Sequence, residues 1–343
     1  MSIDSSHSNY SNSSENLSKL ENVLIIGNGG RENALAWTIA RNELIKKIYV
    51  VPGNAGTEKI KKCKRVFIEL EEEELIKKLK YLDIDLVVIG PEIPLAKGIG
   101  DILRNNNFKV FGPNKNGAKL EYSKSWAKEF MQSAKIPTAQ SWKANSLEEA
   151  EKIINSHHDP LVVKADGLAS GKGVFIPESK HESLEATKVI FNGKFGDAGQ
   201  VVVLEEKLQG PEVSVFALSD GNKFILLPTA QDHKRLNDND KGPNTGGMGA
   251  YSPTPLLKKD YLERITKEII EPTFSELKRR NIEYRGVLYF GLMITSFGPK
   301  VIEYNCRFGD PECQTIMPLM DKDFVVLLQK CAMGQLNGNE RIA

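Results

Sequence analysis

A polar segment from Asp232 to Tyr251 carries the densest set of reactive side chains in the chain. It opens with four consecutive charged or titratable residues, Asp-His-Lys-Arg at 232–235, and continues into a turn with glycines at 246, 247 and 249. Such a run suits neither a buried strand nor a long amphipathic helix. Closely spaced glycines let backbone N–H groups approach an anion. The segment therefore indicates either a solvated surface loop or an anion-binding loop that has a carboxylate and cations beside it.

A second glycine-rich turn, Gly27–Gly30, follows a short apolar segment and precedes an amphipathic pattern that runs to Ala40. The free N–H groups at a helix N-terminus attract phosphate. A nicotinamide-dinucleotide fold is the obvious alternative. That fold expects a third glycine where Glu32 stands, and an acidic residue at the end of the second strand, where the chain reads Val51-Pro52-Gly53-Asn54. The turn therefore favours the phosphate of another kind of ligand.

A third loop, GLASGKG at Gly167–Gly173, resembles a P-loop but lacks its defining residues. That motif needs glycine or alanine where Asp166 stands, and serine or threonine where Gly173 stands. Strand-like segments also lie on both sides of the loop, instead of a strand and a helix. We therefore predict a glycine-rich hairpin that closes over nucleotide phosphates, with Lys164 and Lys172 supplying positive charge.

Glu303 and Asn305 lie two apart in a strand-like segment, so both side chains point to one face. A carboxylate and an amide carbonyl are oxygen ligands of the kind that Mg²⁺ and Mn²⁺ prefer. The preceding strand-like segment, Tyr289–Thr295, holds no acidic residue that would add a third ligand. The pair therefore predicts a metal site that depends on nucleotide oxygens and water.

The elements that must position these groups follow two patterns. Val23–Ile26, Lys47–Val51 and Asp85–Ile89 are apolar, strand-like and separated by helical stretches, which is typical of a parallel sheet in an α/β fold. Each ends in a loop with glycine, and ligands bind beyond the carboxyl ends of such strands. From 123 onward the pattern is α+β, with one long helix expected over Tyr261–Arg280 and a hairpin over 286–304.

Length and charge narrow the class of protein. A chain of 343 residues is expected to form two or three domains. Lys plus Arg number 46 and Asp plus Glu 45, so no basic excess indicates a nucleic-acid partner. The sequence contains no run of 18 apolar residues, so it gives no indication of a membrane partner. The four cysteines form no C-x-x-C pair, which favours reduced thiols and a cytoplasmic location. The Ser- and Asn-rich residues 1–20 are expected to be a disordered tail.

Five segments, taken together and in this order, resemble the glycinamide ribonucleotide synthetases (phosphoribosylamine–glycine ligases), which are ATP-grasp enzymes. They are Gly27–Asn33, Leu161–Ile176, Leu204–Val215, Gln231–Pro253 and Val301–Gln314. The resemblance runs from about 23 to 320, and RFGDPECQ at 307–314 is specific to that family. It implies a parallel αβα domain at 21–122 that binds phosphoribosylamine. It also implies an α+β ATP-grasp domain at 123–318, with a glycine-hairpin lid at about 137–203. Because family members continue with a further domain, 319–343 is expected to be its truncated start.

The resemblance also implies the roles of individual residues. The expected ATP contacts are Lys124, Lys164, Gly171, Lys172, Gly173, Glu205, Leu208 and Glu212. The expected substrate contacts are Gly27, Asn28, Gly29, Gly30, Arg31, Glu32, Gly53, Asn54, Gly90, Glu92, Asp232, Gly246, Gly247 and Arg307. Glu303 and Asn305 would bind the metal, and Arg307, Asp232 and Lys172 would be catalytic. Arg307 suits carboxylate and acyl-phosphate oxygens, and Asp232 suits the glycine ammonium. The chain departs from the family at Asn33, where a histidine is usual, and asparagine cannot titrate.

The reaction implied is ATP-dependent ligation of glycine to 5-phosphoribosylamine through glycyl phosphate, with Mg²⁺ or Mn²⁺. Two alternatives remain at this point. A sister ATP-grasp ligase would keep the lysines and the Glu303/Asn305 pair but would have no reason to carry RFGDPE beside DHKR. A nucleotide-binding but inactive or regulatory protein would be consistent with a missing C-terminal domain. The partners expected are small molecules alone, and the sequence gives no indication of oligomeric state.

Overall fold

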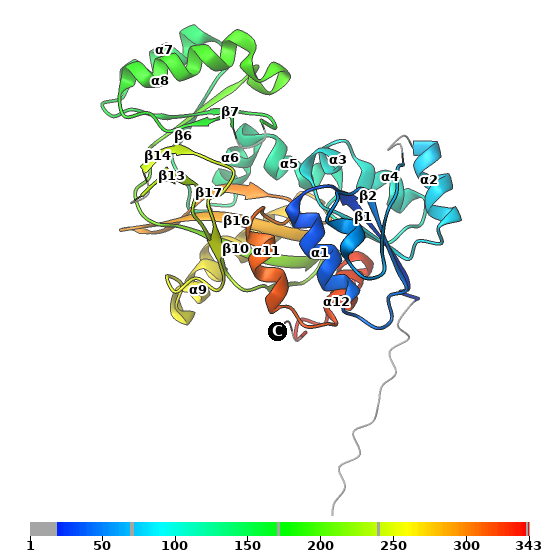
Figure 1. The fold of residues 1–343 in the computed structure, drawn as a ribbon. Coiled ribbons are helices and arrows are strands. Elements are labelled where there is room, and N and C mark those ends of the chain that lie inside the picture. The colour runs from blue at the N-terminus through cyan, green and yellow to red at the C-terminus, as the bar shows by residue number, and fades with distance from the viewer. Residues whose placement is uncertain (1–18, 69–71, 170–171, 239–240, 341, 343) are drawn as a thin grey trace, which may run out of the picture.

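The computed structural model describes residues 19–68, 72–169, 172–238, 241–340 and 342. Figure 1 shows these residues as a sheet with helices around it, a second sheet beside it, and a smaller sheet with two helices at the top of the view. The first two parts share hydrophobic clusters, whereas the smaller part has a cluster of its own.

The first part is a five-stranded parallel sheet in the order β3-β2-β1-β4-β5. Its strands are β1 (Asn22–Gly27), β2 (Lys47–Pro52), β3 (Cys63–Arg65), β4 (Leu86–Ile89) and β5 (Val110–Phe111). Its helices are α1 (Gly30–Ala40), η1 (Thr57–Lys59), α2 (Glu72–Tyr81), α3 (Glu92–Ala96) and α4 (Ile99–Asn105). Leu24 and Ile26 belong to one hydrophobic cluster and Val23 and Ile25 to another. The central strand is therefore covered on both faces, and the expected parallel α/β arrangement is confirmed.

The second part is a four-stranded antiparallel sheet in the order β11-β10-β16-β17. Its strands are β10 (Glu212–Asp220), β11 (Phe224–Leu226), β16 (Arg285–Thr295) and β17 (Gly298–Asn305). The helices beside it are α5 (Lys115–Tyr122), which also contacts α3 of the first part, α6 (Lys124–Ser133), α9 (Lys259–Ile265), η4 (Thr266–Ile270), α10 (Glu271–Arg279), α11 (Glu312–Ile316), η5 (Met317–Leu319) and α12 (Phe324–Met333). The pairing of β16 with β17 confirms the expected hairpin.

Two stretches differ from the expected secondary structure. The helix expected over 261–280 is two α-helices joined by the π-helical turn η4, because Pro272 has no N–H to continue the regular ladder. The segment expected as a polar loop holds two short ladders: β12 (Gln231–Asp232) with β15 (Ala250–Tyr251), and β13 (Arg235–Asn237) with β14 (Lys241–Asn244). Backbone pairing of this kind depends little on the polarity of the side chains.

The smaller part is a sheet in the order β6-β9-β7-β8, in which all neighbours are antiparallel. Its elements are β6 (Ser141–Ala144), α7 (Leu147–Ser156), β7 (Val162–Ala165), β8 (Val174–Phe175), α8 (Lys180–Val189), η2 (Ile190–Lys194), η3 (Gly196–Gly199) and β9 (Val202–Glu205). Ser146 and Ser179 cap α7 and α8 by accepting N–H bonds from the first turn. β7 and β8 are the two strands expected around the glycine loop, whose residue Gly171 lies outside the described residues.

A close backbone contact joins the first two parts. Gly112, which follows β5, donates its N–H to the carbonyl of Arg285 at 3.1 Å. A Cβ atom at Gly286 would lie 3.0 Å from the Cα of Gly112, and Gly286 itself has a φ of +145°. α12, in the stretch expected to open a further domain, packs on β5, β10 and β16. Within the described ranges, no helix is long and apolar enough to cross a membrane.

We predict that Gly286→Ala lowers the free energy of unfolding by about 1–3 kcal/mol, because the methyl group overpacks this seam and the backbone is strained for an L residue. Gly249→Ala is the matched control, since Gly249 has a φ of +154° but no neighbour within 4 Å. Urea unfolding followed by circular dichroism measures both. Equal decreases in the free energy of unfolding of the two variants would show that the contact between Gly112 and Gly286 is not tightly packed.

Candidate active site

One cavity of about 470 Å³ lies where the three parts meet. This volume is within the range of small-molecule sites. The expected site residues that line it are Arg31, Glu92, Lys124, Lys164, Gly173, Glu205, Leu208, Glu212, Asp232, Gly246, Glu303, Asn305 and Arg307. The other expected residues that the structure describes lie outside this lining: Gly27, Asn28, Gly29, Gly30, Glu32, Gly53, Asn54, Gly90, Lys172 and Gly247. Segments far apart in the sequence thus meet in one cavity.

One end of the cavity holds two buried lysines on a single carboxylate. Glu205, at the end of β9, lies 2.9 Å from the Nζ of Lys164 on β7 and 2.9 Å from the Nζ of Lys128 on α6. Lys128 also donates to the Thr138 hydroxyl at 2.9 Å. Burial lowers the pKa of Lys128 to about 8, although Glu205 acts in the opposite direction. Both oxygens of Glu205 thus face ammonium groups of the protein.

Sequence reasoning missed Lys128. It lies four residues after Lys124, so the two share a face of α6, and this spacing was a usable signal. Lys124 donates to the carbonyl of Gly167 at 3.2 Å, and burial lowers its pKa. Lys172, in contrast, is exposed. The positive charge at this end therefore comes from the buried lysines of α6 and β7.

The wall around the lysines is largely apolar. It includes Met131, Val174, Ile176, Leu208 and Met293, which come from α6, β8 and the residue after it, the linker after β9, and β16. An apolar slot with cations at one edge suits a flat ring that is joined to an anionic group. The linker residue Leu208 lines the cavity, with Lys207 and Glu206 beside it.

Glu303 and Asn305 both line the cavity from β17, so the expected common face is present. Across the ladder, Glu303 pairs with Gly291, where a Cβ atom would lie 3.1 Å from the Glu303 Cγ. Burial alone would raise the pKa of Glu303, but nearby lysines, Lys234 first, hold it below its usual value. The pair offers two hard oxygen donors, which fits a divalent cation. No group of three His, Cys, Asp or Glu side chains in the described part of the chain is arranged to hold a metal by itself.

Arg307 follows β17 and is held between two carboxylates. Its Nε lies 3.1 Å from Glu92, and its Nη2 lies 2.8 Å from Glu121 on α5. Glu121 also accepts the backbone N–H of Cys306 at 2.8 Å. Burial acts to raise the pKa of Glu92, but the charges of Arg307 and Arg31 together with hydrogen bonds outweigh it, and the pKa is lowered. Glu121 was missed because nothing in its local sequence marks it as buried.

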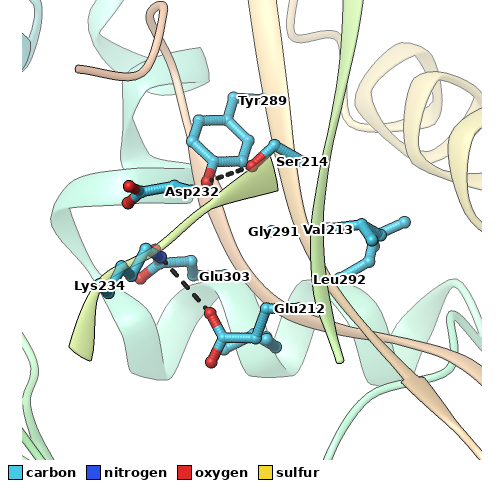
Figure 2. Close-up of a pocket in the computed structure, with 10 residues that line it drawn as sticks. Glu212, Val213, Ser214, Asp232, Lys234, Tyr289, Gly291, Leu292 and Glu303 are labelled. Carbon is cyan, nitrogen blue, oxygen red and sulfur yellow. Dashed lines mark hydrogen bonds and ion pairs between the residues drawn. The ribbon is translucent and has the colours of Figure 1, made fainter. Parts of the chain in front are cut away.

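Asp232 lines the cavity from β12. Figure 2 shows it among the residues of a small pocket that shares part of this lining. Its Oδ1 is buried and has no hydrogen-bond partner among the described residues. Burial raises the pKa of Asp232 to about 6, and the negative charge of Glu312 adds to the shift. A buried carboxylate oxygen without a hydrogen-bond partner is costly to maintain, so Asp232 suits a cationic ligand.

A buried polar cluster lies beside Asp232 and was also missed. Glu312 accepts hydrogen bonds from the hydroxyl of Tyr289 at 2.8 Å and from that of Ser214 at 3.1 Å. A Cβ atom at Gly309 would lie 2.1 Å from the Glu312 carboxylate, so any other residue there would displace Glu312 from its present position. Glu312 belongs to the RFGDPE motif, which was the available signal.

The N-terminal loops are organised by Glu32. Its carboxylate accepts the N–H of Gly29 at 2.7 Å and lies 2.6 Å from the Nε of Arg31. Cβ atoms at Gly27 and Gly90 would overlap the Glu32 side chain, at 2.4 and 2.0 Å. Arg31 also donates to the carbonyl of Phe308 at 3.0 Å. Glu32 and Arg31 therefore have partners within the protein, and Glu32 holds two glycine loops together.

Two asparagines complete this region. Asn54 donates to the carbonyls of Asn28 and Gly29, at 2.9 and 3.2 Å, and accepts the N–H of Gly56 at 2.8 Å. The Oδ1 of Asn33, at the position where a histidine was expected, is buried and has no partner among the described residues. Asn54 thus cross-links two of the loops that were expected to bind the sugar.

Comparisons with known proteins cover nearly all of these residues. The family model "Phosphoribosylglycinamide synthetase, N domain" matches residues 21–121, and the model of the ATP-grasp (A) domain of the same family matches residues 122–313. A phosphoribosylamine–glycine ligase of Nostoc is 46% identical over 92% of this chain and 74% of its own length. The human trifunctional purine biosynthetic protein adenosine-3 is 47% identical over 92% of this chain and 31% of its own length.

Solved structures agree with these matches. The crystal structure of a phosphoribosylamine–glycine ligase from Thermotoga maritima has a TM-score of 0.81 and 37% identity, over 92% of this chain and 76% of that one. A biotin carboxylase from Campylobacter jejuni has a TM-score of 0.70 but 18% identity, which shows the fold alone. The chain spans about three quarters of the single-function ligases and less than a third of the trifunctional proteins. Because the family's N domain and its ATP-grasp domain both match, the chain belongs to the phosphoribosylglycinamide synthetase family of the ATP-grasp superfamily.

Proposed function

We propose that this chain is an ATP-dependent C–N ligase that joins glycine to 5-phosphoribosylamine through glycyl phosphate. The products are glycinamide ribonucleotide, ADP and phosphate. The observation that carries the proposal is the convergence of Arg307, Asp232, the buried lysines and the Glu303/Asn305 pair on one cavity. A sister ligase would need the lysines and the metal pair, but not an aspartate with an unpartnered oxygen, Asp232, in the same cavity as Arg307.

The nucleotide end of the cavity would take ATP. Lys124 and Lys164 would face the phosphates, with the base in the apolar slot near Leu208 and the ribose near Glu212. Phosphoryl transfer needs positioning and neutralisation of negative charge more than covalent help from the protein. Mg²⁺ or Mn²⁺ held by Glu303 and Asn305 would supply further positive charge when bound.

The glycine end would lie between Arg307 and Asp232. The planar guanidinium of Arg307 would orient carboxylate oxygens, and the Asp232 carboxylate would hold the ammonium group. A free carboxylate acylates an amine poorly because oxide is a poor leaving group, whereas phosphate leaves readily from an acyl phosphate. The smaller sheet of 137–203 would act as a lid that keeps water from this intermediate.

The amine acceptor would approach from the parallel-sheet part at 21–122. Glu92 lines the cavity at the end of the loop after β4, and the glycine loops at 27–30 and 53–54 lie on the same rim. The sugar phosphate would bind at this rim, near Gly29, Gly30 and Arg31. A cytoplasmic location is part of the proposal, since all four cysteines are free thiols.

ADP release from purified protein tests the reaction. We expect rapid release only when glycine and phosphoribosylamine are present together, since the acyl phosphate needs the amine for turnover. Each substrate alone is the control. Release that is independent of glycine, or complete absence of release with both substrates, would contradict the proposed ligase activity.

Lys164 is expected to bind the nucleotide. Lys164→Met should weaken the binding of ATP by about 1–3 kcal/mol, the loss expected for a hydrogen bond to a charged group. Isothermal calorimetry with a non-hydrolysable ATP analogue measures it. Lys143→Met, at an exposed position on β6 of the same small sheet, is the control and should bind as the unaltered protein does. An unchanged affinity in Lys164→Met would remove this residue from the site.

The raised pKa of Asp232, about 6, predicts that glycine binding weakens as the pH falls below 6, because the neutral carboxyl no longer attracts an ammonium group. At pH 5 the ionised fraction is about a tenth, so the affinity should fall about tenfold. Since the pKa lies above the ordinary value of 3.8, protonation of this group between pH 6 and 4 favours the folded state. Lost binding would therefore not reflect unfolding driven by Asp232.

Glycine titrations by calorimetry, with metal and a non-hydrolysable ATP analogue present, check this pH dependence without the acceptor substrate. Asp232→Asn should bind glycine weakly at every pH and lack the dependence. Asp260→Asn, an exposed position on α9, should keep it. If Asp232→Asn keeps the same pH profile as the unaltered protein, another group is responsible.

A further inference from the structure

Lys234 lies between two carboxylates that were expected to bind different ligands. Its Nζ is 3.6 Å from an oxygen of Glu212, the residue expected at the ribose, and 3.9 Å from an oxygen of Glu303, the expected metal ligand. Figure 2 shows the side chain reaching between the two from the loop after β12. Sequence reasoning noted Lys234 within the DHKR run but gave it no role. The structure places its charge at the junction of the nucleotide and metal positions.

The geometry indicates that the ammonium group is held by charge and not by directional bonds. Both distances exceed the usual range for an N–H···O hydrogen bond. The side chains of Lys234, Glu212 and Glu303 are 32%, 42% and 34% exposed, so they remain in contact with solvent. The backbone, in contrast, is anchored, because the Lys234 carbonyl accepts the N–H of Thr245 at 2.7 Å and its hydroxyl at 2.9 Å. A fixed backbone with a loosely held ammonium group permits the side chain to change partners.

The charges make such a change necessary once a metal and a nucleotide bind. With Lys234 beside it, Glu303 already has a cation, and a divalent cation at the same carboxylate would repel the ammonium group. A triphosphate would supply new negative charge in the same cavity, which Lys234 also lines. The metal and the ammonium group therefore compete for Glu303 until the nucleotide arrives.

We propose that Lys234 is an exchangeable cation. It neutralises Glu303 and Glu212 in the nucleotide-free protein, which disfavours binding of metal alone, and it moves to the triphosphate when metal and nucleotide bind together. The inference rests on the proposed function for the second half of this exchange but not for the first. Lys234 thereby makes metal binding depend on nucleotide binding.

Binding of Mn²⁺ alone to nucleotide-free protein, followed by electron paramagnetic resonance, tests the first half. The unaltered protein should bind Mn²⁺ weakly. Lys234→Met should bind it at least about tenfold more tightly, because the competing charge is gone. Lys234→Arg keeps the charge and should behave like the unaltered protein. Lys259→Met, at an exposed position on α9, controls for removal of a lysine elsewhere. Equal Mn²⁺ affinities in Lys234→Met and the unaltered protein would overturn the proposal.

The second half is tested by ADP release with glycine and phosphoribosylamine. Lys234→Met should reduce turnover about a hundredfold, the order of loss seen when one preorganised donor to a developing negative charge is removed. Tighter Mn²⁺ binding with unchanged turnover would overturn the movement to the triphosphate. Lys234→Gln, which keeps a polar side chain, carries both measurements if the Met variant does not fold. If the unaltered protein itself shows no turnover, the proposed ligase function is contradicted. The Mn²⁺ affinities still test whether Lys234 competes with the metal for Glu303.

Discussion

The ion pairs of Arg307 with Glu92 and Glu121 are the interaction on which the arrangement of the site depends. The guanidinium follows β17 of the antiparallel sheet, whereas Glu92 begins α3 at the end of the parallel sheet and Glu121 lies on α5. Removing such charges from water costs several kcal/mol for each ion, and the cost is offset only when the partners are well placed. The pairing therefore fixes the two sheets relative to each other at the cavity.

Charge within the cavity follows a common pattern. Glu205 is held by two lysines, Arg307 by two carboxylates, and Lys234 lies between two carboxylates. Asp232 is the exception, with one oxygen buried and unpartnered among the described residues. Glu205 and Arg307 each have two close partners, so their charges are fixed before a ligand binds, which is the condition for electrostatic preorganisation. Lys234, at 3.6 and 3.9 Å from its carboxylates, is held more loosely. A cationic ligand would therefore be stabilised most strongly beside Asp232.

The fold could be predicted where burial leaves a local pattern. The strands β1, β2 and β4 are apolar and flanked by glycine turns, so each was recognised from its residues. β3 and β5 escaped notice, because strands of three and two residues are too short for any periodicity. The π-helical turn before Glu271 also escaped notice, although Pro272 was visible, because the hydrophobic spacing continues on both sides of it.

The sequence by itself determined the class of fold, the position of the glycine loops and, together with the family resemblance, about half of the polar groups that line the cavity. Those features depend on residue type and spacing within short segments. Only the tertiary structure decided which charged groups have partners in the protein. Glu32 and Arg31 were expected to contact ligands because they follow a glycine turn. In the structure they bind each other, Glu32 also accepts the N–H of Gly29, and Arg31 also donates to the carbonyl of Phe308. Lys128 and Glu312 carried a local signal, in the helical spacing from Lys124 and in the RFGDPE motif. Glu121 carried none, because burial of its charge is set by elements distant in the sequence, which no local pattern reports.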